Sequence, residues 1–218
     1  MKKTQYAILW DMDGTLIDTT DMHMESWVKA MARYGKVIQK TETLEHFGKN
    51  NRSITPLFFP DASPELIAEI SDQKEADFRD LVPGNAVVYP GVLEWLKVFQ
   101  AQGIVQSIAS SAPMDNIDVL LDETGIREYF DHIGSGAYIP GKPDPTLFLN
   151  VSTALNIPPQ NCLVIEDAPA GIEAAIRASM PVVAITNSRP ASDLCDANLI
   201  IKEFSSAALH QVEEKFLA

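Results

Sequence analysis

Asp11 and Asp13 are two carboxylates that could act together in one reaction. They stand two residues apart, directly after a short apolar run. The run Tyr6–Trp10 is continuous, partly aromatic and too short for a helix, so it predicts a buried strand. In extended backbone, residues i and i+2 point the same way, so both carboxylates would face one spot at the carboxyl end of that strand. Gly14 then allows a sharp turn. The plainer alternative is an Asx-rich turn that only ends the strand.

Three further polar groups follow strand-like runs or lie in the loops after them. They are, in chain order, Ser110 with Ser111, Lys142 in a Gly-Lys-Pro setting, and Glu166 with Asp167. The carboxyl ends of parallel strands meet at one edge of a sheet, where open α/β folds bind their ligands. We therefore expect these groups to join the first two acids at that edge. Taken singly, they have plainer interpretations as a strand-end hydroxyl, a surface lysine and a helix cap.

Four carboxylates gathered at one edge would be charged at pH 7 and would repel one another. At about 4 Å and an effective dielectric constant near 20, each pair costs roughly 4 kcal/mol. Such a cluster requires a cation or shared protons. Oxygen ligands without a paired His or Cys favour a hard ion, and Mg²⁺ is the best match. Magnesium, a lysine and a hydroxyl beside a carboxylate indicate phosphoryl transfer, in which a carboxylate can itself be the nucleophile.

The elements that must position these groups alternate between strand and helix in the second half of the chain. Strands are expected at 6–10, 104–109, 132–133, 162–165, 182–185 and 199–201. Helices are expected at 92–102, 113–123, 144–155, 169–178 and 205–216. This alternation predicts a doubly wound parallel sheet with helices on both faces.

A helical block without a convincing strand separates the first strand from this alternation. Its helices are expected at 18–34, where apolar residues share one face, and from Pro64 onward, with Ser63 as N-cap. The stretch 46–52 between them is polar and loop-like. The predicted fold class is α/β: a doubly wound, Rossmann-like parallel-sheet core domain of residues 1–17 and 87–218, with an inserted helical cap domain of residues 18–86.

Composition narrows the classes of partner. The 218 residues carry a net charge of −13, which argues against a broad nucleic-acid or anionic membrane surface. A local pocket for a small phosphorylated metabolite remains compatible with this charge. Cys162 and Cys195 make no disulfide framework, and the first apolar run is too short for a signal peptide or a membrane span. We expect a reduced, cytoplasmic protein that is a monomer or a weak dimer.

These motifs together resemble those of the haloacid dehalogenase superfamily. The matching residues are Asp11-Met12-Asp13-Gly14-Thr15, Ser110 after a strand, Lys142 before a proline, and Glu166-Asp167 after another strand. The chain is similar over essentially its whole length to the branch with a helical cap inserted after the first strand. That branch includes phosphatases and β-phosphoglucomutases.

The resemblance implies a role for each motif. Asp11 would be the nucleophile and would bind Mg²⁺ with Glu166 and Asp167, and the backbone carbonyl of Asp13 would be a further ligand. Asp13 would be the general acid and base, with a carboxyl pKa raised for that task. Ser110 would donate to the phosphoryl oxygens, and Lys142 would offset charge on the phosphate and on the nucleophile.

Four residues are expected to bind the substrate: His23, Trp27, Arg52 and Ser111. The first two are neighbours at i and i+4 on one helix and match a His and a Trp of the mutases. An arginine in the polar stretch could bind a distal phosphate or sugar bidentately. Ordinary packing for the tryptophan and a solvated loop position for the arginine remain open.

The chain also departs from the mutase pattern. Ala112 and Pro113 stand where the mutases carry a serine and a lysine that grip a second phosphate. The cap loop is one residue longer between Gly48 and Arg52. We therefore favour a Mg²⁺-dependent phosphomonoester hydrolase acting on a small sugar or polyol phosphate through an aspartyl-phosphate, with a phosphosugar mutase as the alternative. A dehalogenase would leave the other acids unused, and a receiver-like domain lacks so large an insertion.

Overall fold

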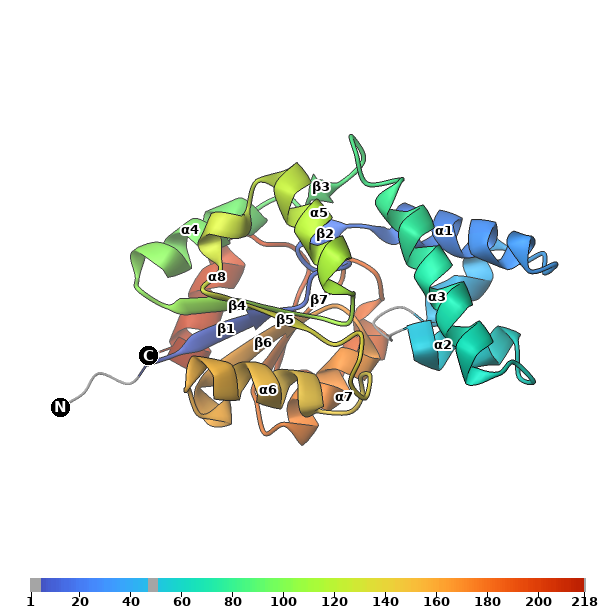
Figure 1. Ribbon diagram of the computed structural model, residues 1–218. Coiled ribbons are helices and arrows are strands. Elements are labelled where there is room, and N and C mark those ends of the chain that lie inside the picture. The colour runs from blue at the N-terminus through green and yellow to red at the C-terminus, as the bar shows by residue number, and fades with distance from the viewer. Residues whose placement is uncertain (1–4, 47–50, 218) are drawn as a thin grey trace.

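The computed structural model describes residues 5–46 and 51–217, which form a sheet-based core and a helical cap (Figure 1). The core contains a six-stranded sheet whose neighbouring strands are all parallel, in the order β5-β4-β1-β6-β7-β8. Its strands are β1 (Ala7–Trp10), β4 (Val105–Ser110), β5 (His132–Ser135), β6 (Cys162–Glu166), β7 (Val182–Ile185) and β8 (Leu199–Ile201). The expected fold class is confirmed.

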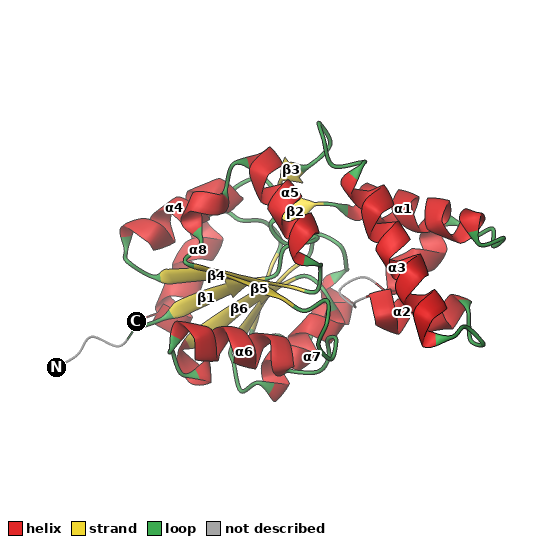
Figure 2. Ribbon diagram, viewed as in Figure 1, coloured by secondary structure: helices red, strands yellow, loops and turns green. Residues whose placement is uncertain are grey.

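Helices cover both faces of this sheet (Figure 2). They are α4 (Val92–Ala101), α5 (Met114–Thr124), α6 (Thr146–Leu155), α7 (Pro169–Arg177) and α8 (Ser206–Val212), the last continued by a π-helical turn at Glu213–Leu217. Short 3-10 turns are η2 (Arg127–Tyr129), η3 (Pro159–Asn161) and η4 (Ala191–Leu194). In the described part of the chain, no helix is both long and apolar enough to cross a membrane.

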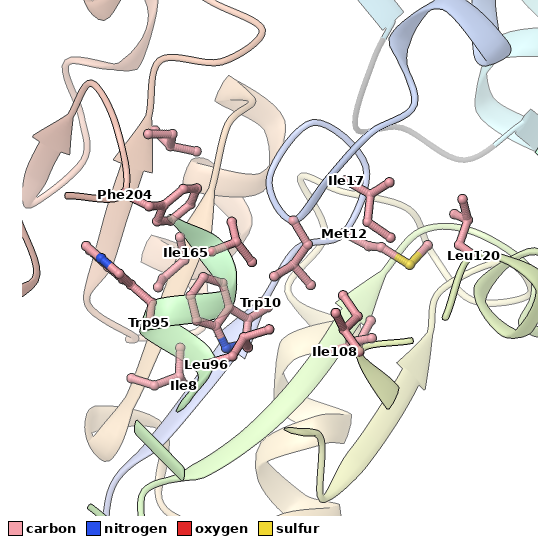
Figure 3. Close-up of a cluster of buried hydrophobic side chains, with 14 of the residues drawn as sticks. Ile8, Trp10, Met12, Ile17, Trp95, Leu96, Ile108, Leu120, Ile165 and Phe204 are labelled. Carbon is pink, nitrogen blue, oxygen red and sulfur yellow. The ribbon is translucent and has the colours of Figure 1, made fainter. Parts of the chain in front are cut away.

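The alternation of side chains along β1 divides the core into two apolar clusters. Ile8 and Trp10 pack with α4, α5 and α8 on one face, while Ala7 and Leu9 pack with α6 and α7 on the other. The Trp10 ring lies among aromatic side chains of the first cluster, 6.5 Å from the Trp95 ring (Figure 3). Because β1 is buried on both faces, the residues that follow it are held in a fixed place.

The cap comprises α1 (Thr20–Arg33), the 3-10 helix η1 (Lys40–His46), α2 (Asn51–Phe58) and α3 (Pro64–Arg79). The Ser63 hydroxyl accepts the Leu66 N–H at 3.3 Å, which is the N-cap that the sequence predicts. Trp27, Met31, Ile38 and Ile54 form the apolar centre of the cap. The cap therefore has its own small core.

The structure corrects two details of the expected layout. A two-stranded antiparallel sheet, β2 (Ile17–Asp18) with β3 (Val87–Val88), joins cap and core where the sequence predicts no strand. The second correction concerns the polar stretch 46–52. Its residues Asn51 and Arg52 begin helix α2 instead of lying in a loop, whereas the expected lengthening after Gly48 falls outside the described residues.

Candidate active site

The turn after β1 carries Asp11 and Asp13 to the carboxyl edge of the sheet. The Asp11 N–H donates to the Ile165 carbonyl at 2.9 Å, so pairing with β6 continues one residue beyond the strand. Gly14 has φ +86°, and any side chain at this position would run into the Asp167 carboxylate. A glycine is therefore needed both for the turn and for the approach of the two chain segments.

Lys142 is the centre of a buried ion cluster. Its Nζ lies 2.5 Å from Asp11 Oδ1, 2.8 Å from Glu166 Oε1 and 3.4 Å from the Ala109 carbonyl oxygen. Burial lowers the pKa of Lys142, but the charges and hydrogen bonds of the two carboxylates outweigh it and raise that pKa above its usual range. The lysine therefore stays charged while fully removed from solvent.

Three buried acids, Asp11, Glu166 and Asp167, converge beside this lysine. Each offers a carboxylate oxygen, and the three oxygens lie within 4.8 Å of one another. Glu166 Oε2 also accepts the N–H groups of Asp167 and Ala168 at 2.8 and 2.7 Å. These amides at the start of the β6–α7 loop hold the glutamate in place.

The acid cluster is short of positive charge. Burial raises the pKa of Asp11 well above its usual range in spite of Lys142. Burial, followed by the charge of Glu166, raises the pKa of Asp167 to about 7. A divalent cation held by carboxylate oxygens would remove this imbalance, so the residues present fit Mg²⁺.

The expectation that four carboxylates meet in one cluster is wrong for Asp13, whose carboxylate lies outside the cluster of three acids and faces the cap. Its Oδ1 accepts from Thr19 Oγ1 at 2.8 Å and contacts His23 Nε2 at 3.1 Å, while Ser110 Oγ lies 3.4 Å from Oδ2. Burial raises the pKa of Asp13, but the charge and hydrogen bond of His23 outweigh it, and Thr19 and Lys74 add to the net lowering. The expectation of a raised pKa is therefore wrong for this arrangement.

His23 links Asp13 to a buried lysine of the cap. Its Nδ1 lies 2.7 Å from the Nζ of Lys74, and its ring stacks on Phe78 with 4.2 Å between ring centres. Lys74 is only 1% exposed. His23 thus contacts the second aspartate of the motif, which is a different position from the expected contact with substrate.

The other expected substrate-binding residues lie in distinct settings. Trp27 is 4% exposed and packs within the apolar centre of the cap, so it supports the cap in this arrangement. The Arg52 guanidinium lies over the ring of Tyr138, 5.3 Å from the centre of that ring. Tyr138 belongs to the loop that leads to Lys142. Ser111 and Arg52 share a pocket between cap and core, lined also by Asn51, Ser71, Asp72, Glu75, Pro113, Ala137 and Tyr138.

Several residues of this region carry no sequence signal of their own. Thr19, Lys74 and Tyr138 belong to no motif, and only the tertiary structure brings them to the site. Ser188, whose hydroxyl donates to the Asp167 carboxylate, follows β7 at the same sheet edge. The rule that strand ends gather the site is the one signal that points to it.

The fold and this site define an α/β protein with a Rossmann-like parallel sheet and an acidic strand-end centre beneath a helical cap. The model of the family described as haloacid dehalogenase-like hydrolase matches residues 8–185, and the chain belongs to this family. The resemblance expected from the motifs is thereby confirmed.

The chain is also similar to named phosphatases and to a solved structure of this family. It is 29% identical to the validoxylamine A 7'-phosphate phosphatase of Streptomyces hygroscopicus subsp. limoneus, over 90% of this chain and 93% of the relative. It is also 29% identical to the phosphorylated carbohydrates phosphatase of Thermotoga maritima, over 78% and 79%. The solved structure of β-phosphoglucomutase from Clostridium difficile matches with a TM-score of 0.87 and 26% identity, over 98% of both chains. The expected enzyme class, a phosphatase of this family, is confirmed.

Proposed function

We propose that this phosphatase is a Mg²⁺-dependent phosphomonoester hydrolase that acts on a small sugar or polyol phosphate through an aspartyl-phosphate on Asp11. The observation that carries the proposal is the placement of Lys142 Nζ, 2.5 Å from Asp11 and 2.8 Å from Glu166, beside the three-carboxylate cluster. The phosphatases among the relatives support hydrolysis of phosphate esters, and one of them is named for phosphorylated carbohydrates.

Asp11, Glu166, Asp167 and the backbone carbonyl of Asp13 would hold the metal. When bound, Mg²⁺ would neutralise charge on the carboxylates and on the phosphoryl oxygens. Lys142 adds a fixed positive charge beside the nucleophile, and Ser110 offers a hydroxyl at the end of β4. Such groups stabilise the charge that the phosphoryl oxygens carry during transfer.

The reaction proceeds in two displacements at phosphorus. A carboxylate oxygen of Asp11 attacks the phosphorus, and the bond from phosphorus to the sugar oxygen breaks. That oxygen takes a proton from Asp13 and leaves as the alcohol. Water then attacks the phosphorus and gives its proton to Asp13, the bond to Asp11 breaks, and inorganic phosphate is released.

Asp13 must acquire its proton from a neighbour. Its pKa is lowered beside His23, so it is ionised before the substrate binds. His23 Nε2 lies 3.1 Å from Asp13 Oδ1 and can pass its proton to that carboxylate while Nδ1 takes a proton from Lys74 Nζ, 2.7 Å away. The phosphoryl charge brought by the substrate favours transfer of that proton onto the carboxylate.

Phosphorus NMR with glucose 6-phosphate, β-glucose 1-phosphate, sorbitol 6-phosphate and glycerol 3-phosphate tests the proposal. Release of inorganic phosphate with Mg²⁺, and none with EDTA, is the expected result. No turnover of any phosphate ester would overturn it. Thermal unfolding with and without Mg²⁺ gives a second reading that does not depend on turnover.

A phosphosugar mutase is the second candidate, favoured by the likeness to the β-phosphoglucomutase structure. It would use the same phospho-aspartate but return the group to the bound sugar. In the NMR panel, positional isomers appearing after addition of glucose 1,6-bisphosphate would identify it. Ala112 and Pro113 provide no polar side chain for a second phosphate, which favours hydrolysis.

A further inference from the structure

Asn116, on the core helix α5, is fully buried against the cap helix α3. Its Nδ2 donates to Glu75 Oε2, and its Oδ1 accepts from Arg79 Nη1 at 2.8 Å. Glu75 and Arg79 are four residues apart on α3 and therefore lie on one face of that helix. One side chain of the core thus holds two charged residues of the cap.

An amide suits this position because it carries a donor and an acceptor at once. The carboxylate requires a donor and the guanidinium requires an acceptor. Hydrogen bonds to charged groups are stronger than those between neutral groups, and losing one partner in a buried place is costly. We call Asn116, Glu75 and Arg79 the clasp.

Successive contacts connect the clasp to Asp13 at the carboxyl edge of the sheet. Glu75 contacts Lys74 Nζ at 3.2 Å, and Lys74 contacts His23, which contacts Asp13. Glu75 Oε1 also accepts from Asn51 Nδ2 at 2.5 Å, at the start of the helix that carries Arg52. The clasp therefore supports both the pair formed by His23 and Asp13 and the cap side of the pocket.

The pocket between cap and core depends on the same contacts. Its cap wall includes Asn51 and Glu75, and its core wall includes Ser111 and Tyr138. A pocket with walls from two units is complete only while those units are together. Breaking the clasp would therefore separate the two walls of the pocket without changing any residue that touches the phosphate.

We propose that Asn116 is a positioning residue that holds the cap closed, so that the pocket is complete and the cap residues reach Asp13. This inference rests on the proposed function for its catalytic consequence. The mechanical part, closure of α3 on α5, stands independently of any substrate.

A distance measurement tests the mechanical part. In a Cys195→Ser background, Glu65→Cys on α3 and Lys97→Cys on α4 place spin labels at exposed sites of cap and core. Asn116→Ala is expected to lengthen and broaden the distance distribution, and Asn116→Asp to do so further because two carboxylates would then face each other. Arg79→Ala, at a half-buried site, should give a smaller change in the same direction. Asp115→Ala, on the exposed side of α5, is the matched control and should leave the distances unchanged.

A kinetic measurement with glucose 6-phosphate tests the consequence. A smaller closed population reduces apparent affinity in proportion, so Asn116→Ala should raise KM about tenfold and change kcat less than about threefold. Asn116→Asp should raise KM more, and adding Glu75→Gln to it should lower KM again because the glutamine amide can donate to the new carboxylate.

Three outcomes would overturn the inference. They are unchanged distances in both Asn116 variants, a fall in kcat with no change in KM, and equal effects of the Asp115 control. If the wild-type protein hydrolyses no ester of the panel, the proposed function fails, and the distance measurement still decides whether the clasp closes the cap.

Discussion

Replacing Asp167 by asparagine should stabilise the metal-free protein at pH 8. Asp167 is 3% exposed, and burial with the charge of Glu166 raises its pKa from 3.8 to about 7. With a raised pKa, the folded state binds a proton more tightly than the unfolded chain does. The free energy of unfolding therefore falls as pH rises from about 4 to about 7, and it stays low above that pH. The full shift corresponds to about 4 kcal/mol.

Asparagine occupies the same space without the charge. Thr15 Oγ1, 3.1 Å from Asp167 Oδ1, can still donate to the amide oxygen, and the Ser188 hydroxyl can turn to accept. We expect about half of the electrostatic cost to be recovered, which is about 2 kcal/mol. For a chain of this size that corresponds to a rise in Tm of roughly 4–8 °C, measured by calorimetry at pH 8 with EDTA. Asp115→Asn, an exposed control, should change the free energy by less than about 0.5 kcal/mol.

Measuring the stability advantage of Asp167→Asn at two pH values separates an electrostatic effect from a packing effect. At pH 4 the wild-type carboxyl is protonated in the folded state, so the advantage of Asp167→Asn should nearly vanish. Mg²⁺ at pH 8 should raise the Tm of the wild type more than that of the variant, because a ligand stabilises the state that binds it. An advantage equal at pH 4 and pH 8, or no advantage at pH 8, would refute the reasoning.

Three other substitutions test the chemistry. Asp11→Asn should abolish turnover and phosphoenzyme, measured by phosphate release and intact mass; activity above about a tenth of wild type would disprove the nucleophile assignment. Asp13→Asn should slow turnover by about 10²–10⁴-fold while leaving Mg²⁺ affinity by calorimetry nearly unchanged, and a parallel loss of affinity would argue against its acid–base role. Arg52→Ala should raise KM for a sugar phosphate and leave p-nitrophenyl phosphate nearly unaffected; equal losses on both would exclude a role in specificity.

Most of the fold follows from local patterns. Most core strands are short apolar runs and the core helices are amphipathic, so both are visible in the sequence, and Ser63 marks the start of α3 as predicted. The two-residue strands β2 and β3 are too short for any periodicity and exist only because they pair with each other. Helix α2, which carries Arg52, begins at Asn51, but its polar first residues and the internal Pro56 give it the sequence pattern of a loop.

One part of the candidate site is likewise predictable from the sequence, and the other part depends on tertiary packing. Asp11, Lys142, Glu166 and Asp167 follow strands or lie in strand-end loops, and strand order brings them together as the sequence predicts. The partners of Asp13 depend instead on how the cap packs on the core. Lys74 is a charged residue on a helix, and its burial beside His23 follows from the packing of α3 against α1.

The sequence by itself determined which groups could react, because strand ends and glycine turns are local features with a known spatial consequence. Asp11 and Asp13 are two residues apart, and that spacing alone predicts that they share one edge of the sheet. The tertiary structure decided how they differ. Asp11 lies among buried acids and has a raised pKa, whereas Asp13 faces His23 and has a lowered one. The physical reason is that a pKa depends on burial and on charges brought from distant segments, and no local spacing records either.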